Sequence, residues 1–140
     1  MKVGELCERE VVVSKPEVTV RDAAGIMNER GVGALVVVDP LGRPLGIVTD
    51  RDVLVRCTAV GKDPARMRLR RLMSGPVVWT HEDSPLEAAL EEMARLRVRR
   101  LPVVDARERL VGILGLDDVV LAHSDPDTPI GQALRANLGG

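Results

Sequence analysis

The stretch LGIVTDRDVL, residues 45–54, has a counterpart in VGILGLDDVV, residues 111–120. The same offset of 66 residues aligns residues 3–54 (copy one) with residues 69–120 (copy two) without a gap, and 15 of the 52 aligned positions are identical. This period is longer than the roughly 20–50 residues typical of solenoid repeats. The chain is therefore a duplicated supersecondary unit, and two such small units bury more surface together than either buries alone.

Each copy predicts the order strand–helix–strand–strand–helix. Continuous apolar runs indicate strands that are covered on both faces, and a polar turn that begins with Asp39 or Asp105 joins the last two strands into a hairpin. The predicted strands are Val11–Val13, Ala34–Val38, Leu45–Thr49, Val77–Trp79, Leu101–Val104 and Leu110–Leu114. The expected fold class is α/β (α+β), with two pseudo-symmetric βαββα units packed sheet to sheet.

Helix-start signals follow each first strand. In copy two Ser84 is the predicted N-cap, with Pro85 at N1 and Glu87 at N3, and in copy one Thr19 and Asp22 take the capping roles. A closing helix starts near Asp50 in copy one and near Asp117 in copy two. We expect one unit at residues 1–62, a second at 63–123, and a tail at 124–140 with a short helix at Ile130–Asn137.

Composition excludes several functional classes. The chain has 140 residues, of which 45 % are hydrophobic and 1 % aromatic, with Trp79 as the sole aromatic residue. A formal net charge of −1 argues against a general polyanion binder, so nucleic acid is not an expected partner. No apolar run is long enough to span a membrane and no secretory signal precedes the domain, so we expect a cytoplasmic protein that does not enter membranes.

The few chemically reactive residues do not form a recognisable catalytic or metal set. Cys7 and Cys57 are too few for a disulfide framework. With His81 and His123 they lack the paired spacing of zinc sites, and no third group orients a Cys–His pair for catalysis. We therefore expect no metal and no enzymatic activity.

The motifs VRRLPVVD at residues 98–105 and GIVTDRDVL at 46–54, within the βαββα order, resemble the cystathionine-beta-synthase (CBS) domain. The tandem pair resembles a Bateman module, and the segment between the copies is similar to that of stand-alone bacterial CBS-pair proteins of the hypoxic-response type. The resemblance implies a regulatory module that needs no cofactor and binds AMP, ADP, ATP or a related adenosyl ligand in the cleft between the copies. It also implies a homodimer, whose output passes through an effector protein.

The stretch Gly46–Asp52 matches the ribose signature of that family. Gly46 permits close approach of backbone, Thr49 lies at a helix N-terminus with free N–H groups, and Asp50 lies within the motif. The Asp52 carboxylate is expected to accept hydrogen bonds from both ribose hydroxyls. The alternative is that Thr49 and Asp52 only cap the helix, although Asp is a poor substitute for the Glu of a capping box.

Copy two lacks one of the ribose-binding side chains of copy one but has basic residues that copy one lacks. It keeps Asp118 but has Gly115 in place of the hydroxyl. Where copy one has Gly33 and Ala34, copy two has basic residues at positions at which the family often binds phosphate. We therefore expect one composite site, with a weaker twin related by the repeat. Its predicted residues are Thr49 and Asp52 for ribose, Arg99 or Arg100 for phosphate, and Val11 and Val12, or Val77 and Val78, for adenine.

The sequence also supports two other interpretations. Arg95 and Arg97 are interpreted as a solvated helix end that complements the C-terminal dipole. The lost hydroxyl at Gly115 and the uncharged Gly33–Ala34 pair favour a second functional hypothesis, in which the chain is a structural interaction or dimerisation module with a vestigial ligand site.

Overall fold

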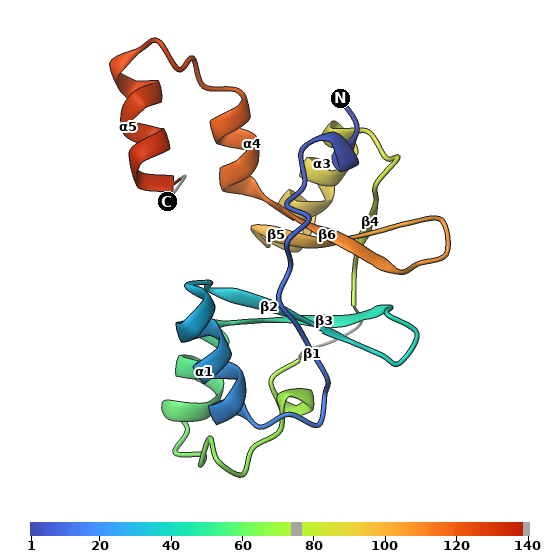
Figure 1. The fold of residues 1–140 in the computed structure, drawn as a ribbon, viewed down its shortest axis with the longest axis vertical. Coiled ribbons are helices and arrows are strands. Elements are labelled where there is room, and N and C mark those ends of the chain that lie inside the picture. Colours follow the sequence, from blue (N-terminus) through green and yellow to red (C-terminus); the bar gives the residue numbers. More distant parts are fainter. Residues whose placement is uncertain (74–76, 139–140) are drawn as a thin grey trace.

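The computed structural model describes residues 1–73 and 77–138, and it contains one three-stranded sheet from each copy (Figure 1). In both sheets a short strand pairs in parallel with the first strand of an antiparallel hairpin. The strands are β1 (Val13–Ser14), β2 (Ala34–Val38), β3 (Pro44–Thr49), β4 (Thr80–His81), β5 (Arg100–Val104) and β6 (Leu110–Gly115).

The helices follow the predicted order, and the mixed α/β fold of two βαββα units is confirmed. They are α1 (Val20–Arg30), α2 (Asp50–Val53), α3 (Leu86–Leu96), α4 (Leu116–Ala122) and α5 (Pro129–Leu138), with a π-helical turn at Leu54–Thr58 and 3-10 turns at Val3–Glu5 and Leu69–Arg71. Figure 1 shows the two hairpins next to each other in the middle of the molecule, with α1 and α3 on opposite outer sides. No helix in the described ranges is long and apolar enough to cross a bilayer.

The first strand of each copy begins later than predicted. Strands over Val11–Val13 and Val77–Trp79 were expected, whereas β1 contains only Val13 and Ser14, and β4 contains only Thr80 and His81. Val12 still accepts a hydrogen bond from the Val36 N–H, at 3.0 Å, but the chain before it diverges from the sheet. The valines that precede the two strands therefore lie between the two sheets and belong to neither strand. They are Val11, Val12, Val77 and Val78.

The start of α3 also differs from the prediction. Pro85, not Ser84, is the N-cap, and Leu86 is the first helical residue. The repeat explains this, because Pro85 is equivalent to Thr19, which caps α1 as predicted and accepts a hydrogen bond from the Asp22 N–H at 3.2 Å. A proline has no side-chain acceptor for the N–H groups of the first turn.

The two copies exchange a pair of equivalent segments. Val3 and Cys7, from copy one, are buried in the core of copy two, and Leu69 and Leu72, from copy two, are buried in the core of copy one. Val3 and Leu69 are equivalent in the repeat. Each unit therefore has a complete apolar core only when the other copy contributes its first turn.

Backbone hydrogen bonds fix the exchanged segments in the same way on both sides. The Leu86 N–H donates to the Met1 carbonyl at 2.9 Å, and the equivalent Val20 N–H donates to the Met67 carbonyl at 2.8 Å. These contacts satisfy a free N–H group at the start of α3 and of α1. The same bond is therefore present in both copies, whether or not the N-cap residue has a side-chain acceptor.

Glycines at equivalent positions allow the exchanged segments to cross the hairpins. The Glu8 N–H and carbonyl both bond to the backbone of Ile113, at 2.9 Å each, which brings Glu8 directly over Gly112. A Cβ atom at Gly112 would lie 2.8 Å from the Glu8 carbonyl oxygen, and one at Gly46 would lie 3.0 Å from Met73 Sδ. Chain crossing is thus a reason for glycine at both positions that is independent of any ligand.

We predict that Gly112→Ala lowers the free energy of unfolding by about 1–3 kcal/mol, because the new methyl group meets backbone that cannot move aside. Gly46→Ala should cost less, since the methionine opposite it is flexible. Gly25→Ala is the control: nothing lies within 4 Å of its Cβ position in α1, so alanine should stabilise the chain by roughly 0.5–1 kcal/mol. Urea unfolding measures all three, and wild-type stability for Gly112→Ala would contradict the crossing argument.

Candidate functional site

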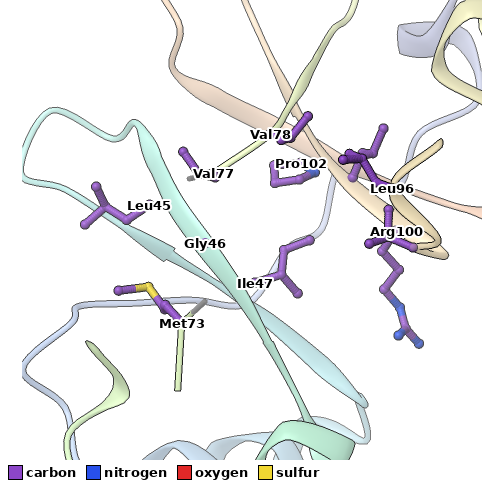
Figure 2. Close-up of a pocket in the computed structure, with 11 residues that line it drawn as sticks. Leu45, Gly46, Ile47, Met73, Val77, Val78, Leu96, Arg100 and Pro102 are labelled. Carbon is purple, nitrogen blue, oxygen red and sulfur yellow. The ribbon is translucent and has the colours of Figure 1, made fainter. Parts of the chain in front are cut away.

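Two cavities related by the repeat lie between the copies. The first, which we call the composite cavity, has an apolar part of about 260 Å³ and a polar part of about 510 Å³ that share Ile47, Val98 and Arg100. Figure 2 shows the apolar part, in which Arg100 extends its guanidinium away from the apolar side chains. That part is lined by Leu45, Gly46, Ile47, Met73, Val77, Val78, Leu96, Val98, Arg100, Leu101 and Pro102.

The polar part brings together the residues predicted from the two copies. Thr49, Asp50 and Asp52, at the end of β3 and the start of α2, face Arg99 and Arg100, which lie just before and at the start of β5. Because Val77 and Val78 line the adjoining apolar part, this cavity contains the predicted polar set and one of the two predicted valine pairs.

Asp52 closes a capping box with Thr49, contrary to the expectation that Asp is a poor member of one. Its Oδ2 atom accepts hydrogen bonds from the Thr49 N–H at 2.9 Å and the Thr49 hydroxyl at 3.0 Å, while the Asp52 N–H donates back to Thr49 Oγ1 at 3.1 Å. Aspartate is long enough here because α2 turns immediately after β3. Capping and ligand contact are compatible, since the box uses only one carboxylate oxygen.

The second carboxylate oxygen is oriented by an arginine. Arg56 Nε lies 3.8 Å from Asp52 Oδ1, and Arg56 also donates to the Leu72 carbonyl at 2.9 Å. Asp50 is directed differently: its Oδ1 accepts from the Arg51 N–H at 2.8 Å, and its N–H donates to the Gly33 carbonyl at 3.0 Å. Asp52 is thus held by its own helix, with Oδ1 beside a fixed positive charge.

Arginines dominate the polar part, and sequence reasoning missed some of them. Arg51, Arg56 and Arg97 line it in addition to Arg99 and Arg100. The interpretation of a solvated helix end fits Arg95, which pairs with Glu92, and Arg97 is an exposed helix-end residue that also lines the cavity. The repeat held a signal for this, because the equivalent residue of Arg97 is Gly31, at a helix end where glycine is favoured.

The second cavity, which we call the twin cavity, measures about 320 Å³ and has the opposite charge. Val11, Val12 and Asp118 line it, together with Gly115 and the uncharged Gly33 and Ala34. Four carboxylates, those of Glu8, Glu10, Asp117 and Asp118, surround it, and Arg100 is the one basic residue among the described residues that line it. The predicted valine pairs are therefore separated, with one in each cavity.

Crowding of negative charge in the twin cavity affects Asp118. Partial burial, followed by the nearby charge of Asp117, raises the pKa of the Asp118 carboxyl, and Glu8 acts in the same direction. The hydrogen bond from the Gly115 N–H to Asp118 Oδ2 is long, at 3.3 Å, and opposes the shift only partly. This cavity is therefore unfavourable for a phosphate group. Within residues 1–73 and 77–138, no three His, Cys, Asp or Glu side chains are grouped to hold a metal ion.

The profile of the family described as "CBS domain" matches residues 3–57 and 69–125, which covers both copies. The chain belongs to the CBS domain family. CBS pairs are regulatory modules, and the resemblance proposed from the two motifs is confirmed.

Relatives of two kinds are similar to this CBS pair. An uncharacterized protein of Methanopyrus kandleri is 35 % identical over 120 residues, which are 86 % of this chain and 61 % of that protein, so the chain spans less than two thirds of it. Hypoxic response protein 1 of Mycobacterium tuberculosis is 31 % identical over 118 residues, 84 % of this chain and 80 % of that protein. The latter match confirms the similarity to the hypoxic-response type.

Among solved structures, the cytosolic domain of the Mg²⁺ channel MgtE in complex with ATP has a TM-score of 0.74 and 31 % sequence identity. The match covers 85 % of this chain and 47 % of that one.

We predict that Asp118→Asn raises the stability of the CBS pair at pH 7. A carboxyl whose folded-state pKa is raised destabilises the folded state once it ionises, so the advantage of the neutral amide should shrink as the pH falls toward 3. Melting temperatures of both proteins across this pH range measure the effect. Asp127→Asn, at an exposed loop position, is the control and should change little. A constant difference at all pH values would contradict the charge argument.

Proposed function

We propose that this CBS pair is a regulatory, non-catalytic module which binds an adenine nucleotide in the composite cavity. One observation carries the proposal: Thr49 and Asp52 of copy one and Arg99 and Arg100 of copy two line the same polar space. An apolar part adjoins that space, so the two regions match a flat base and a charged tail. Their combined size lies within the roughly 300–1,000 Å³ of ligand pockets.

Each part of an adenine nucleotide has a partner in this arrangement. The base lies among the aliphatic side chains of Ile47, Val77 and Val78, because no aromatic ring lines the apolar part. The ribose hydroxyls donate to Asp52 Oδ1, the carboxylate oxygen that the capping box leaves available. The phosphate accepts from the guanidinium groups of Arg99 and Arg100, whose planar forks suit phosphate oxygens. The related MgtE domain, solved with ATP, supports this ligand class.

A homodimer is the second part of the proposal. Apolar side chains on the helical segments that begin at the two cavities face outward, and they are Leu54 (61 % exposed), Val55 (46 %), Leu116 (39 %) and Val120 (40 %). A second copy of the chain would cover them, and a symmetric pair is the commonest assembly. Ligand binding changes partner affinity only if the ligand favours one arrangement of that dimer over another.

The second candidate function is a dimerisation module whose ligand sites are vestigial. The twin cavity favours it, since Gly115 has no hydroxyl there and Gly33 and Ala34 provide no charge. The two candidates differ in whether any nucleotide binds.

Calorimetric titration of the full chain with AMP, ATP, NADH and S-adenosylmethionine tests the proposal. We expect at least one adenine nucleotide to bind, with one strong site per chain. The absence of binding heat with all four would overturn the sensing function and leave the dimerisation module.

Paired variants locate the site. Asp52→Ala should weaken binding by roughly 10- to 100-fold, the range for losing charge-assisted hydrogen bonds, and Asp118→Ala should change it little. Melting curves of both variants show whether the chain is still folded, because Asp52→Ala also removes a helix cap. Equal losses of affinity in the two variants would contradict a single composite site.

A further inference from the structure

The polar part of the composite cavity carries more positive charge than a single phosphate requires. Five guanidinium groups line it against the carboxylates of Asp50 and Asp52, a formal excess of three positive charges. Arg56 is occupied by Asp52 and by the Leu72 carbonyl. Within the described ranges, none of the other four, Arg51, Arg97, Arg99 and Arg100, forms an ion pair, whereas Arg95, outside the cavity, does.

Arg97 occupies its position at a cost in stability. It ends α3 in the left-handed conformation, with φ 57° and ψ 42°, and its N–H donates to the Ala94 and Met93 carbonyls. The equivalent end of α1 is Gly31, with φ 64° and ψ 35°. Glycine adopts this conformation without steric penalty, whereas a residue with a Cβ atom does not.

The twin cavity shows what the same backbone provides where the equivalent three positions are uncharged. The residues equivalent to Arg97, Arg99 and Arg100 are Gly31, Gly33 and Ala34, none of which carries charge. Four carboxylates line that cavity. The duplicated fold thus tolerates a neutral set at these three positions in copy one.

We propose that Arg97 is a phosphate-binding residue that makes the composite cavity selective for adenosine polyphosphates over AMP. A terminal phosphate carries about two negative charges at neutral pH, and each further phosphate group adds more. With Arg99 and Arg100 on the phosphate nearest the ribose, Arg97 contacts the phosphates beyond it. A strained residue at a binding surface is consistent with this role, because strain persists where function depends on it. This inference rests on the proposed nucleotide binding.

The experiment compares AMP, ADP and ATP by calorimetry on the full-length wild-type chain and on Arg97→Gly. We expect the wild type to bind ATP and ADP at least tenfold more tightly than AMP. Arg97→Gly should lower ATP affinity by about tenfold, the usual effect of losing one charge-assisted hydrogen bond, and should change AMP affinity less than twofold. Arg97→Lys keeps the charge and the strain, and it should retain part of the preference.

Thermal melting without ligand separates this role from a structural one. Arg97→Gly should raise the melting temperature by roughly 2 °C, because glycine relieves the strained turn. A variant that is more stable and yet binds ATP more weakly cannot be explained by damage to the fold. Arg95→Gln is the matched control; it removes a neighbouring guanidinium outside the cavity and should leave all three affinities unchanged.

Two results would overturn the inference while leaving the proposed function intact. One is equal affinity of the wild type for AMP and ATP. The other is an unchanged ATP affinity in Arg97→Gly, which would make Arg97 only a strained helix end. If none of the three nucleotides binds to the wild type, the inference fails, and the proposed function fails with it only if NADH and S-adenosylmethionine do not bind either.

Discussion

The exchange of two equivalent segments between the copies is the contact on which this structure depends. A unit of about 60 residues buries too little surface to be stable alone. Val3 and Leu69 each complete the core of the opposite unit, and backbone carbonyls of the same segments satisfy the first N–H groups of α3 and α1. Neither core is complete without the other copy, so the two sheets are held face to face by covalent connection as well as by packing.

The exchange also creates the cavities. Each crossing segment must leave one unit and enter the other before its sheet begins, so Val11 and Val12 on one side, and Val77 and Val78 on the other, lie between the sheets. The same geometry arises twice because the backbone is duplicated. What differs is the lining: arginines surround one cavity and carboxylates the other. The charged lining residues belong to neither apolar core, so they can differ between the copies without loss of core packing.

Asp52 connects the candidate site to the fold. One of its oxygens closes the capping box at the start of α2, and the other lies beside Arg56 in the composite cavity. The segment that starts there continues into the exposed Leu54 and Val55, on the proposed dimer face. A ligand at Asp52 thus contacts the first turn of a helical segment whose outer face is apolar, which gives a short physical route from binding to assembly.

The sequence by itself determined the duplication and the order of elements, because these follow from local apolar runs, turn residues and a direct comparison of the copies. The pairing of Thr49 and Asp52 with Arg99 and Arg100 followed only from the resemblance to the CBS family. Only the tertiary structure decided that the first turns are exchanged, that the first N–H groups of α1 and α3 donate to distant carbonyls, that Arg97 faces a cavity, and that the twin cavity is acidic. All four depend on contacts between residues far apart in the chain, and hydrophobic periodicity reports only which face of an element is buried, not which segment covers it.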